Sequence, residues 1–347
     1  MHWRLFKFCS PFIVFGLAWI AFSATGWFCF LPLIWAFSII PFVELFIKPN
    51  KHNLDAAEEE LAKSDKRYDY LLYLIVPFQF GSLFYFLFSL QDTTLSVIDI
   101  TGRIISMGLL CGIFGINVGH ELGHRAKPFE QFLAKVLLLS SLYMHFFIEH
   151  NKGHHKRVAT KEDPASARSG ESVFAFYPRT IVYSYLSAWK IANKEMNKKG
   201  VSIFSFNNEM IQFSIIQITF VVIIFFLLGP IIVGYFLLAA IIGIGLLEAV
   251  NYIEHYGLQR QKINEEKYER ALPIHSWNSN HVLGRFMLFE LSRHSDHHYL
   301  ASRKYQILQH HENAPQMPTG YPGMMILAHI PPLFFWVMKK QLRVINT

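Results

Sequence analysis

The sequence predicts an all-α integral membrane protein in which six transmembrane helices are arranged as three hairpins. Of the 347 residues, 52% are hydrophobic, which is too apolar for an ordinary soluble domain. The apolar residues gather in runs close to the roughly 20 residues that a helix needs to span a bilayer. The runs also occur in pairs, because very short turns join them two by two at residues 24–26, 91–95 and 229–230.

Six apolar runs are interpreted as membrane spans within one membrane-embedded domain that covers residues 1–347. The expected spans are residues 8–24, 27–47, 70–90, 97–118, 211–228 and 231–253. The first run resembles a signal peptide, because basic residues precede it and Ala21 and Ser23 form a possible cleavage motif. A second full-length run follows almost at once, which favours an uncleaved first hairpin.

The distribution of Lys and Arg predicts the orientation. The connection 48–69, the segment 119–210 and the segment 255–347 are rich in basic residues, whereas the three short turns contain none. Basic residues are enriched in cytoplasmic loops, so both termini and these segments are expected to face the cytoplasm. Arg103, near the outer end of the fourth span, is the one exception.

Three shorter segments are expected to lie outside the bilayer or at its surface. Lys51–Lys66 contains both charge signs and is interpreted as a solvated helix. Phe129–Phe147 is interpreted as an interfacial or half-submerged helix, because a full span would separate neighbouring histidine groups. Gly323–Met338, which Pro331 and Pro332 interrupt, is interpreted in the same way.

Charge and cysteine content exclude several classes of function. The net charge of +7 is what membrane orientation and anionic lipid headgroups would produce, although an acidic partner could also dock there. The basic residues are spread over several loops, so no nucleic-acid partner is expected. Cys9, Cys29 and Cys111 are isolated, which indicates neither a disulfide framework nor a cysteine metal site.

Nine of the seventeen histidines form four groups at or just beyond the ends of apolar runs. They are His120 and His124 in HELGH, His150, His154 and His155 in EHNKGHH, His255 in NYIEHYGLQR, and His294, His297 and His298 in RHSDHH. A helix brings residues three and four apart onto one face, and histidine is the commonest transition-metal ligand. Nine imidazoles are too many for one ion and about right for two. A site rich in imidazole and free of thiolate suits Zn, Cu, Fe or Ni, and non-haem iron that activates O2 is favoured.

HELGH also matches H-E-x-x-H, the zinc metalloprotease signature, in which the glutamate acts as general base. A catalytic zinc needs only three protein ligands, so this alternative leaves most of the grouped histidines unexplained. Glu121 is then an outer-sphere or structural residue. A non-catalytic metal carrier is a further alternative, and His255 alone could be a simple polar residue at the membrane interface.

Four carboxylates flank the histidine groups and could accept the second N–H of a ligand imidazole, which fixes its tautomer. They are Glu149, Asp163, Glu254 and Asp296. Each could equally be a solvated charge at the interface.

At these histidines the chain resembles the membrane di-iron hydroxylases and desaturases. Over residues 27–338 the chain is similar to the alkane 1-monooxygenase family. The motifs that carry this similarity are HELGHR, EHNKGHHKRVATKEDPASAR, NYIEHYGLQR, HSWNSNH, HSDHH and PTGYPG. This chain differs from the family pattern at two places. Lys161 stands where the family commonly has proline, and Tyr299–Ala301 stands where a small residue and a proline usually follow HSDHH. No CxxC pair follows Met338, so no fused rubredoxin domain is expected.

The resemblance implies a cytosol-facing di-iron centre held by histidines alone, at these nine positions, in a multi-pass protein of the bacterial inner membrane. It implies O2-dependent terminal hydroxylation of medium- or long-chain n-alkanes taken from the bilayer. Electrons would come from rubredoxin, which a flavin-dependent reductase reduces. Asn251, His275 and Asn278 lie in the motifs and are further candidates for supporting the ligands.

Two questions of substrate stay open from the sequence. Trp19, Trp27 and Trp35 on the first two spans could limit chain length, or could simply pack or anchor the helices. The same chemistry could instead act on a xylene-type methyl-aromatic compound or a fatty-acyl chain.

Overall fold

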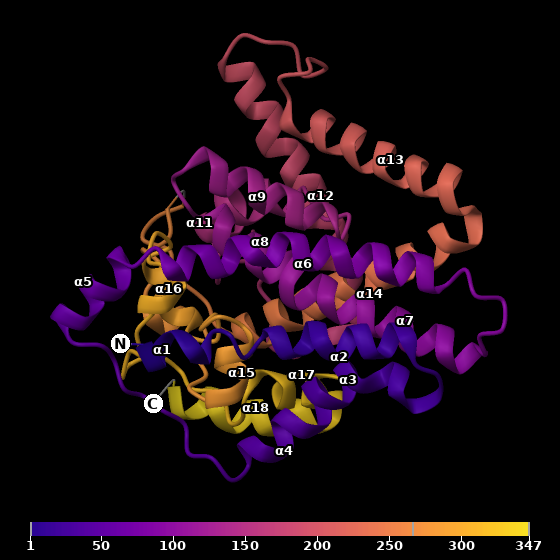
Figure 1. Ribbon diagram of the computed structural model, residues 1–347. Coiled ribbons are helices and arrows are strands. Elements are labelled where there is room, and N and C mark those ends of the chain that lie inside the picture. The colour runs from indigo at the N-terminus through magenta and orange to yellow at the C-terminus, as the bar shows by residue number, and fades with distance from the viewer. Residues whose placement is uncertain (1, 266, 346–347) are drawn as a thin grey trace. The chain divides into compact units, whose positions relative to one another are not determined.

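The computed structural model describes residues 2–265 and 267–345, and helices joined by loops make up this part of the chain (Figure 1). They include two isolated β-bridges, Lys262 with Tyr268 and Asn278 with Gln316, but no β-strand. The prediction of an all-α fold is therefore confirmed for the described part of the chain.

Six helical stretches among the described residues are long and apolar enough to cross a membrane, as the sequence predicted. They are Arg4–Ser23, Gly26–Glu44, Arg67–Ser89, Val97–Gly123, Glu209–Leu228 and Pro230–His255. The fourth and sixth extend beyond the predicted ends, so His120 stands near the end of the fourth and His255 is the last residue of the sixth. The hairpin arrangement and the cytosolic orientation stay predictions.

The first two spans are not single regular helices. The first comprises α1 (His2–Lys7) and α2 (Phe12–Ser23), and the second comprises η1 (Gly26–Phe30), α3 (Leu31–Ile34), η2 (Trp35–Ile39) and α4 (Ile40–Glu44). η2 is a π-helical turn that ends just before Pro41. Proline has no amide hydrogen to donate along a helix, which accounts for a change of hydrogen-bond pattern there.

By its internal contacts the chain divides into two compact units. The first contains residues up to Trp35 together with 67–152 and 185–247, and the second contains 36–66, 153–184 and the residues from Glu248 onward. Three helices contribute to both units: the π-helical turn η4 (Glu149–His154), α12 (Val173–Lys198) and α14 (Pro230–His255).

In the first unit, α6 (Arg67–Ser89), α7 (Val97–Leu110) and the π-helical turn η3 (Cys111–Ile116) pack with α2. Phe15 and Phe114 stack with ring centroids 4.1 Å apart. A Cβ built on Gly243 of α14 would lie 2.5 Å from the Cβ of Cys111. Small residues let membrane helices approach closely, so α14 rests directly on the segment that leads into α8 (Asn117–Gly123).

The single interfacial helix predicted over Phe129–Phe147 was wrong in extent, because this segment contains two separate helices. The helix α9 covers only Pro128–Leu139, and the short α10 covers Phe146–Ile148. Between them the Ser140 hydroxyl donates to the Leu137 carbonyl at 2.7 Å, and Leu142 has a φ of 53°. Serine hydroxyls that bond to nearby carbonyls compete with helix continuation. The 26-residue helix α12, by contrast, was not predicted from the sequence.

In the second unit, α5 (Ala56–Ser64) confirms a helix within Lys51–Lys66, and Asp55 and Glu58 form a capping box at its start. The helix α15 (Val282–Met287) lies against α4, where the Glu44 carboxylate accepts from the Gly284 amide at 2.8 Å. The helices α17 (Tyr321–Ala328) and α18 (Pro331–Ile345) are separated at the predicted proline break.

Candidate metal centre

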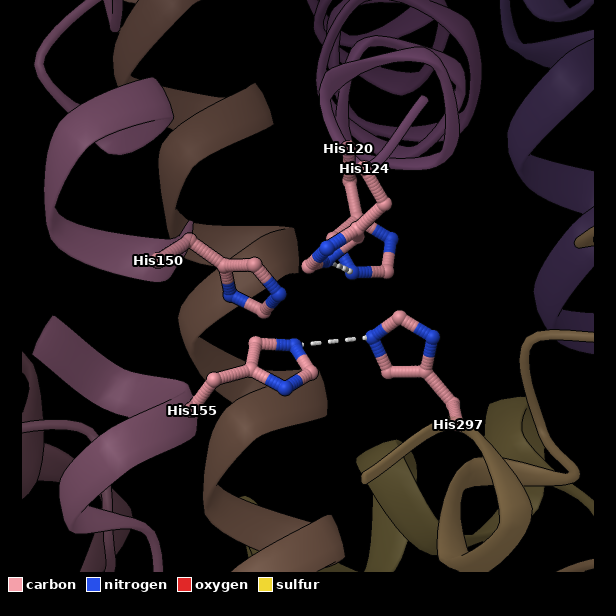
Figure 2. A group of neighbouring side chains, drawn as sticks. All are labelled: His120, His124, His150, His155 and His297. Atoms are coloured by element: carbon pink, nitrogen blue, oxygen red, sulfur yellow. Dashed lines mark hydrogen bonds between the residues drawn. The ribbon is translucent and has the colours of Figure 1, made fainter. Parts of the chain in front are cut away.

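Three histidines converge within the first unit. His120 lies in α8, His124 is the C-cap residue directly after that helix, and His150 lies in η4. The Nε2 atoms of His120 and His124 are 3.2 Å apart. The His150 ring centroid lies 4.3 Å from that of His120 and 5.0 Å from that of His124 (Figure 2). The α-helical spacing argument therefore holds for His120 and His124.

In the second unit, His155 and His297 form a pair. His155 begins α11 (His155–Arg157), and His297 lies in α16 (His294–Tyr299). Their Nε2 atoms are 3.0 Å apart, which the dashed line between them in Figure 2 marks.

Four other histidines of the second unit form a compact buried group. We call it the four-histidine group; its members are His154, His255, His294 and His298. One donor nitrogen from each lies within 4.8 Å of all the others. The Nε2 atoms of His154 and His298 are 3.2 Å apart, and so are those of His255 and His294. The four rings thus direct their Nε2 atoms toward one another.

Each of the two pairs of adjacent histidines, His154–His155 and His297–His298, is split between two groups. His154 belongs to the four-histidine group whereas His155 pairs with His297, and His298 separates from His297 in the same way. The α-helical spacing argument fails for His150 and His154, which are four residues apart but belong to different groups. Both lie in η4, and a π-helix bonds residue i to i+5 instead of i+4.

The chemistry of these donors fits transition-metal ions. Two ligands about 2.1 Å from one ion, at right angles to each other, are about 3.0 Å apart, and the Nε2 separations given above are 3.0–3.2 Å. Burial lowers the pKa of His297 to about 3 and that of His298 well below its usual value. These imidazoles are therefore neutral near pH 7, and a neutral imidazole is the form that binds metal.

Asp163 orients one ligand ring. The Nδ1–H of His154 donates to Oδ2 of Asp163 at 2.8 Å, and the Ser166 hydroxyl donates to the same oxygen at 2.6 Å. Burial raises the pKa of Asp163, but His154 and Ser166 outweigh it and hold that pKa below its usual value. A hydrogen bond at Nδ1 leaves the lone pair on Nε2, which is the atom that faces His298.

Glu254 approaches the four-histidine group differently. Its Oε2 lies 3.1 Å from Nε2 of His294, and its Oε1 accepts from the Tyr321 hydroxyl at 2.7 Å. Both side chains are buried. Sequence reasoning identified Glu254 but missed Tyr321, although Tyr321 stands in the PTGYPG motif, which was the available signal.

Four of the other proposed supporting residues bond to polar groups of the second unit outside the nine histidines. Asp296 accepts from Arg303 and Gln309 and bonds to His311; His275 bonds to Glu269 and Leu272, Asn251 to Glu248, and Asn278 to Gln316. Glu149 is buried in η4, one residue before His150. Their roles toward a metal stay proposals.

Glu121 is engaged in a buried ion pair of the first unit. Its Oε1 lies 2.6 Å from Nη2 of Arg125, whose Nη1 lies 3.3 Å from Asp69. Burial alone would lower the pKa of Arg125, but these carboxylates raise it. A general base that an arginine holds in this way is poorly suited to accept a proton, which argues against the metalloprotease interpretation.

The three tryptophans proposed for the substrate channel have different surroundings in the first unit. The Trp19 indole N–H donates to the Ser82 hydroxyl at 2.7 Å, and its ring stacks on Phe78. Trp27 is 76% exposed, and Trp35 is half-buried.

Comparison with known proteins identifies the family. The family model for fatty acid desaturases matches residues 100–328. An alkane 1-monooxygenase from Pseudomonas putida is 36% identical over 338 residues, which are 97% of this chain and 83% of the relative. The chain belongs to the alkane 1-monooxygenase family. Another member, from Ectopseudomonas oleovorans, is 38% identical over 92% of this chain and 80% of its own length.

A relative of lower identity is named for a different substrate. The hydroxylase component XylM of a xylene/toluene monooxygenase from Pseudomonas putida is 26% identical over 275 residues, 78% of this chain and 73% of its own. As a member of the alkane 1-monooxygenase family, the chain is an oxidoreductase. Membership in this family accounts for the HELGH motif without a protease function.

Proposed function

We propose that the protein hydroxylates the terminal methyl group of medium- or long-chain n-alkanes to primary alcohols, with O2 and a pair of non-haem iron ions. The observation that carries this proposal is the convergence of histidine nitrogens within each unit, in a chain whose relatives are alkane 1-monooxygenases. The overall reaction balances as RH + O2 + 2e⁻ + 2H⁺ → ROH + H2O.

The four-histidine group would hold one iron. The second iron would take its ligands from the other five histidines of the predicted set, His120, His124, His150, His155 and His297. Chain continuity supports this assignment, because His150 and His155 are five residues apart in the consecutive helical segments η4 and α11. When bound, the iron pair supplies the activation of O2. The chain fixes the ligand rings and surrounds them with buried groups that exclude water.

The substrate would enter from the bilayer, where an alkane is already concentrated. The six apolar helices suit a multi-pass protein, and we propose the bacterial inner membrane with both termini and the metal centre on the cytoplasmic side. Trp19, Trp27 and Trp35 remain proposed determinants of chain length. A xylene-type substrate is the second candidate, and the similarity to XylM is the observation that favours it.

Electrons would come from rubredoxin, which a flavin-dependent reductase reduces in turn. The net charge of +7 suits an acidic soluble partner on the cytoplasmic side.

The test uses the full chain in lipid nanodiscs with rubredoxin, its reductase and NADH. We expect octane or hexadecane to give the 1-alcohol, as measured by gas chromatography, and His297→Ala to abolish conversion. His52→Ala is the matched control, because His52 is exposed and outside the histidine groups. Preferential oxidation of xylene, or full activity of His297→Ala, would contradict the proposal.

A further inference from the structure

Four residues of the first unit form a polar cluster beside the π-helical turn η3. We call this cluster the polar clasp; its members are Gln79 of α6, Gly115 of η3, and Ser140 and Ser141 between α9 and α10. The side chains of Gln79 and the two serines are fully buried. Gln79 and Gly115 also lie in two of the membrane-length helices, where polar groups are costly and often serve a function. The polar clasp therefore calls for a physical explanation.

The contacts of the polar clasp bring both serine hydroxyls against η3. The Ser141 hydroxyl donates to the carbonyl of Cys111, the first residue of η3, at 3.1 Å. The Gln79 side-chain amide donates to the Ser140 hydroxyl at 3.1 Å. A Cβ built on Gly115 would lie 2.6 Å from Oγ of Ser141 and 2.8 Å from Oγ of Ser140. The absence of a side chain at Gly115 therefore lets the two hydroxyls approach the turn.

The hydrogen bond from Ser141 supports the backbone of η3. A π-helical turn bonds residue i to i+5, and in η3 the Asn117 amide accordingly donates to the Gly112 carbonyl. Inside a bilayer, where water is excluded, serine side chains can satisfy backbone groups that such a local change of pattern disturbs. The donation from Ser141 to the Cys111 carbonyl is a contact of this kind.

The turn determines the direction in which α8 presents its histidines. Each residue of an α-helix rotates the side-chain direction by about 100°. A π-helical turn closes one residue later than an α-helical turn, so it rotates the helix that follows by about that angle. With this rotation, the rings of His120 and His124 lie 4.3 Å and 5.0 Å from the ring of His150. An uninterrupted α-helix would direct the two histidines to another side.

We propose that the polar clasp positions His120 and His124 toward His150 by holding the π-helical turn in place. Ser141 also precedes His150 by nine positions, with α10 between them, so one contact anchors both ligand-bearing segments of the first unit. The members of the clasp are positioning residues, because they act through the helix backbone. This inference rests on the proposed function for the identity of the metal as iron.

The first test uses the full chain in nanodiscs without metal. Ser141→Ala removes the hydroxyl that bonds to Cys111, and we expect faster hydrogen–deuterium exchange of residues 112–124, measured by mass spectrometry. Ser106→Ala is the matched control, because the fully buried Ser106 hydroxyl donates to the Cys29 carbonyl at 2.7 Å from the same long span, before the turn. It should leave exchange in residues 112–124 unchanged. Unchanged exchange in Ser141→Ala would contradict the role of the clasp.

The second test uses the same variants loaded with ⁵⁷Fe. We expect Ser141→Ala to lose one iron at a chelator concentration at which the wild type and Ser106→Ala keep both. The Mössbauer doublet of the retained iron should stay as in the wild type. Both variants lose one buried hydrogen bond, so their melting temperatures should fall by similar amounts. Loss of iron in Ser141→Ala alone therefore reports positioning and not stability.

Gly115→Ala keeps the test decisive if Ser141→Ala fails to fold. Its methyl group would displace both hydroxyls, so the same iron should be lost, and adding Ser141→Ala should cause little further loss because both changes remove the same hydrogen bond. A folded Ser141→Ala or Gly115→Ala that retains both irons as firmly as Ser106→Ala would overturn the inference. Wild-type protein that holds no iron pair would instead overturn the proposed function, and the exchange comparison without metal would still test the clasp.

Discussion

Replacement of Asp163 by asparagine tests whether the hydrogen-bonded support of a ligand ring determines metal affinity. Asp163 is 2% exposed and receives hydrogen bonds from Nδ1 of His154 and the Ser166 hydroxyl. Asparagine is nearly the same size, but its amide offers one uncharged oxygen to these two donors. The imidazole of His154 then loses its charged partner and the constraint on its tautomer.

The expected magnitude follows from the single charge-assisted bond that is lost. A hydrogen bond to a charged group is worth about 1.5–3 kcal/mol, and loss of an outer partner of a metal ligand typically lowers metal affinity about 10–100-fold. Since a factor of ten corresponds to about 1.4 kcal/mol, the two estimates agree. We expect the affinity for the iron of the four-histidine group to fall about 10–100-fold.

Competition with a chelator of known affinity measures this change in the purified full chain. Glu171→Gln is the matched control, because Glu171 belongs to the same unit but bonds to Arg179 instead of a grouped histidine. It should leave iron affinity unchanged. If Asp163→Asn retains iron as well as the wild type, the hydrogen bond to His154 does not support the metal and the reasoning is refuted.

Two further substitutions test the packing of α14 and the role of Glu121. Gly243→Ala should destabilise the protein by about 1–3 kcal/mol through overpacking against Cys111. Gly245→Ala is the control and should not destabilise it, because a Cβ at Gly245 would meet open space. Thermal unfolding in detergent compares the two variants, and equal melting temperatures would contradict the close approach of α14 to Cys111. Glu121→Gln should cost about 3–5 kcal/mol of stability by breaking the buried pair with Arg125. Folded, iron-loaded protein should still hydroxylate alkanes. Complete loss of turnover in such protein would indicate a catalytic role for Glu121.

The membrane helices could be predicted because their signal is local. A run of about 20 apolar residues must satisfy its backbone hydrogen bonds internally when it enters a bilayer, and a helix does so. The six spans therefore follow from hydropathy, although the ends of the fourth and sixth extended further than expected. The helix α12 was missed because its composition is mixed and it lies in a segment that had been assigned only as cytosolic.

The division of the histidines could not be predicted from their spacing. His154 and His155 are adjacent in sequence yet join different groups, and His150 and His154 have α-helical spacing within a π-helical turn. Contacts between distant segments were equally inaccessible. Tyr321 follows Glu254 by 67 positions, and only the tertiary structure shows that its hydroxyl holds that carboxylate.

The central claim is that the grouped histidines bind a pair of iron ions. Elemental analysis of the purified full-length protein, expressed with iron and zinc both present in the medium, tests it most directly. We expect about two irons per chain, no stoichiometric zinc, and loss of the bound iron in His297→Ala together with loss of turnover. A single zinc per chain, with no iron, would contradict the proposal.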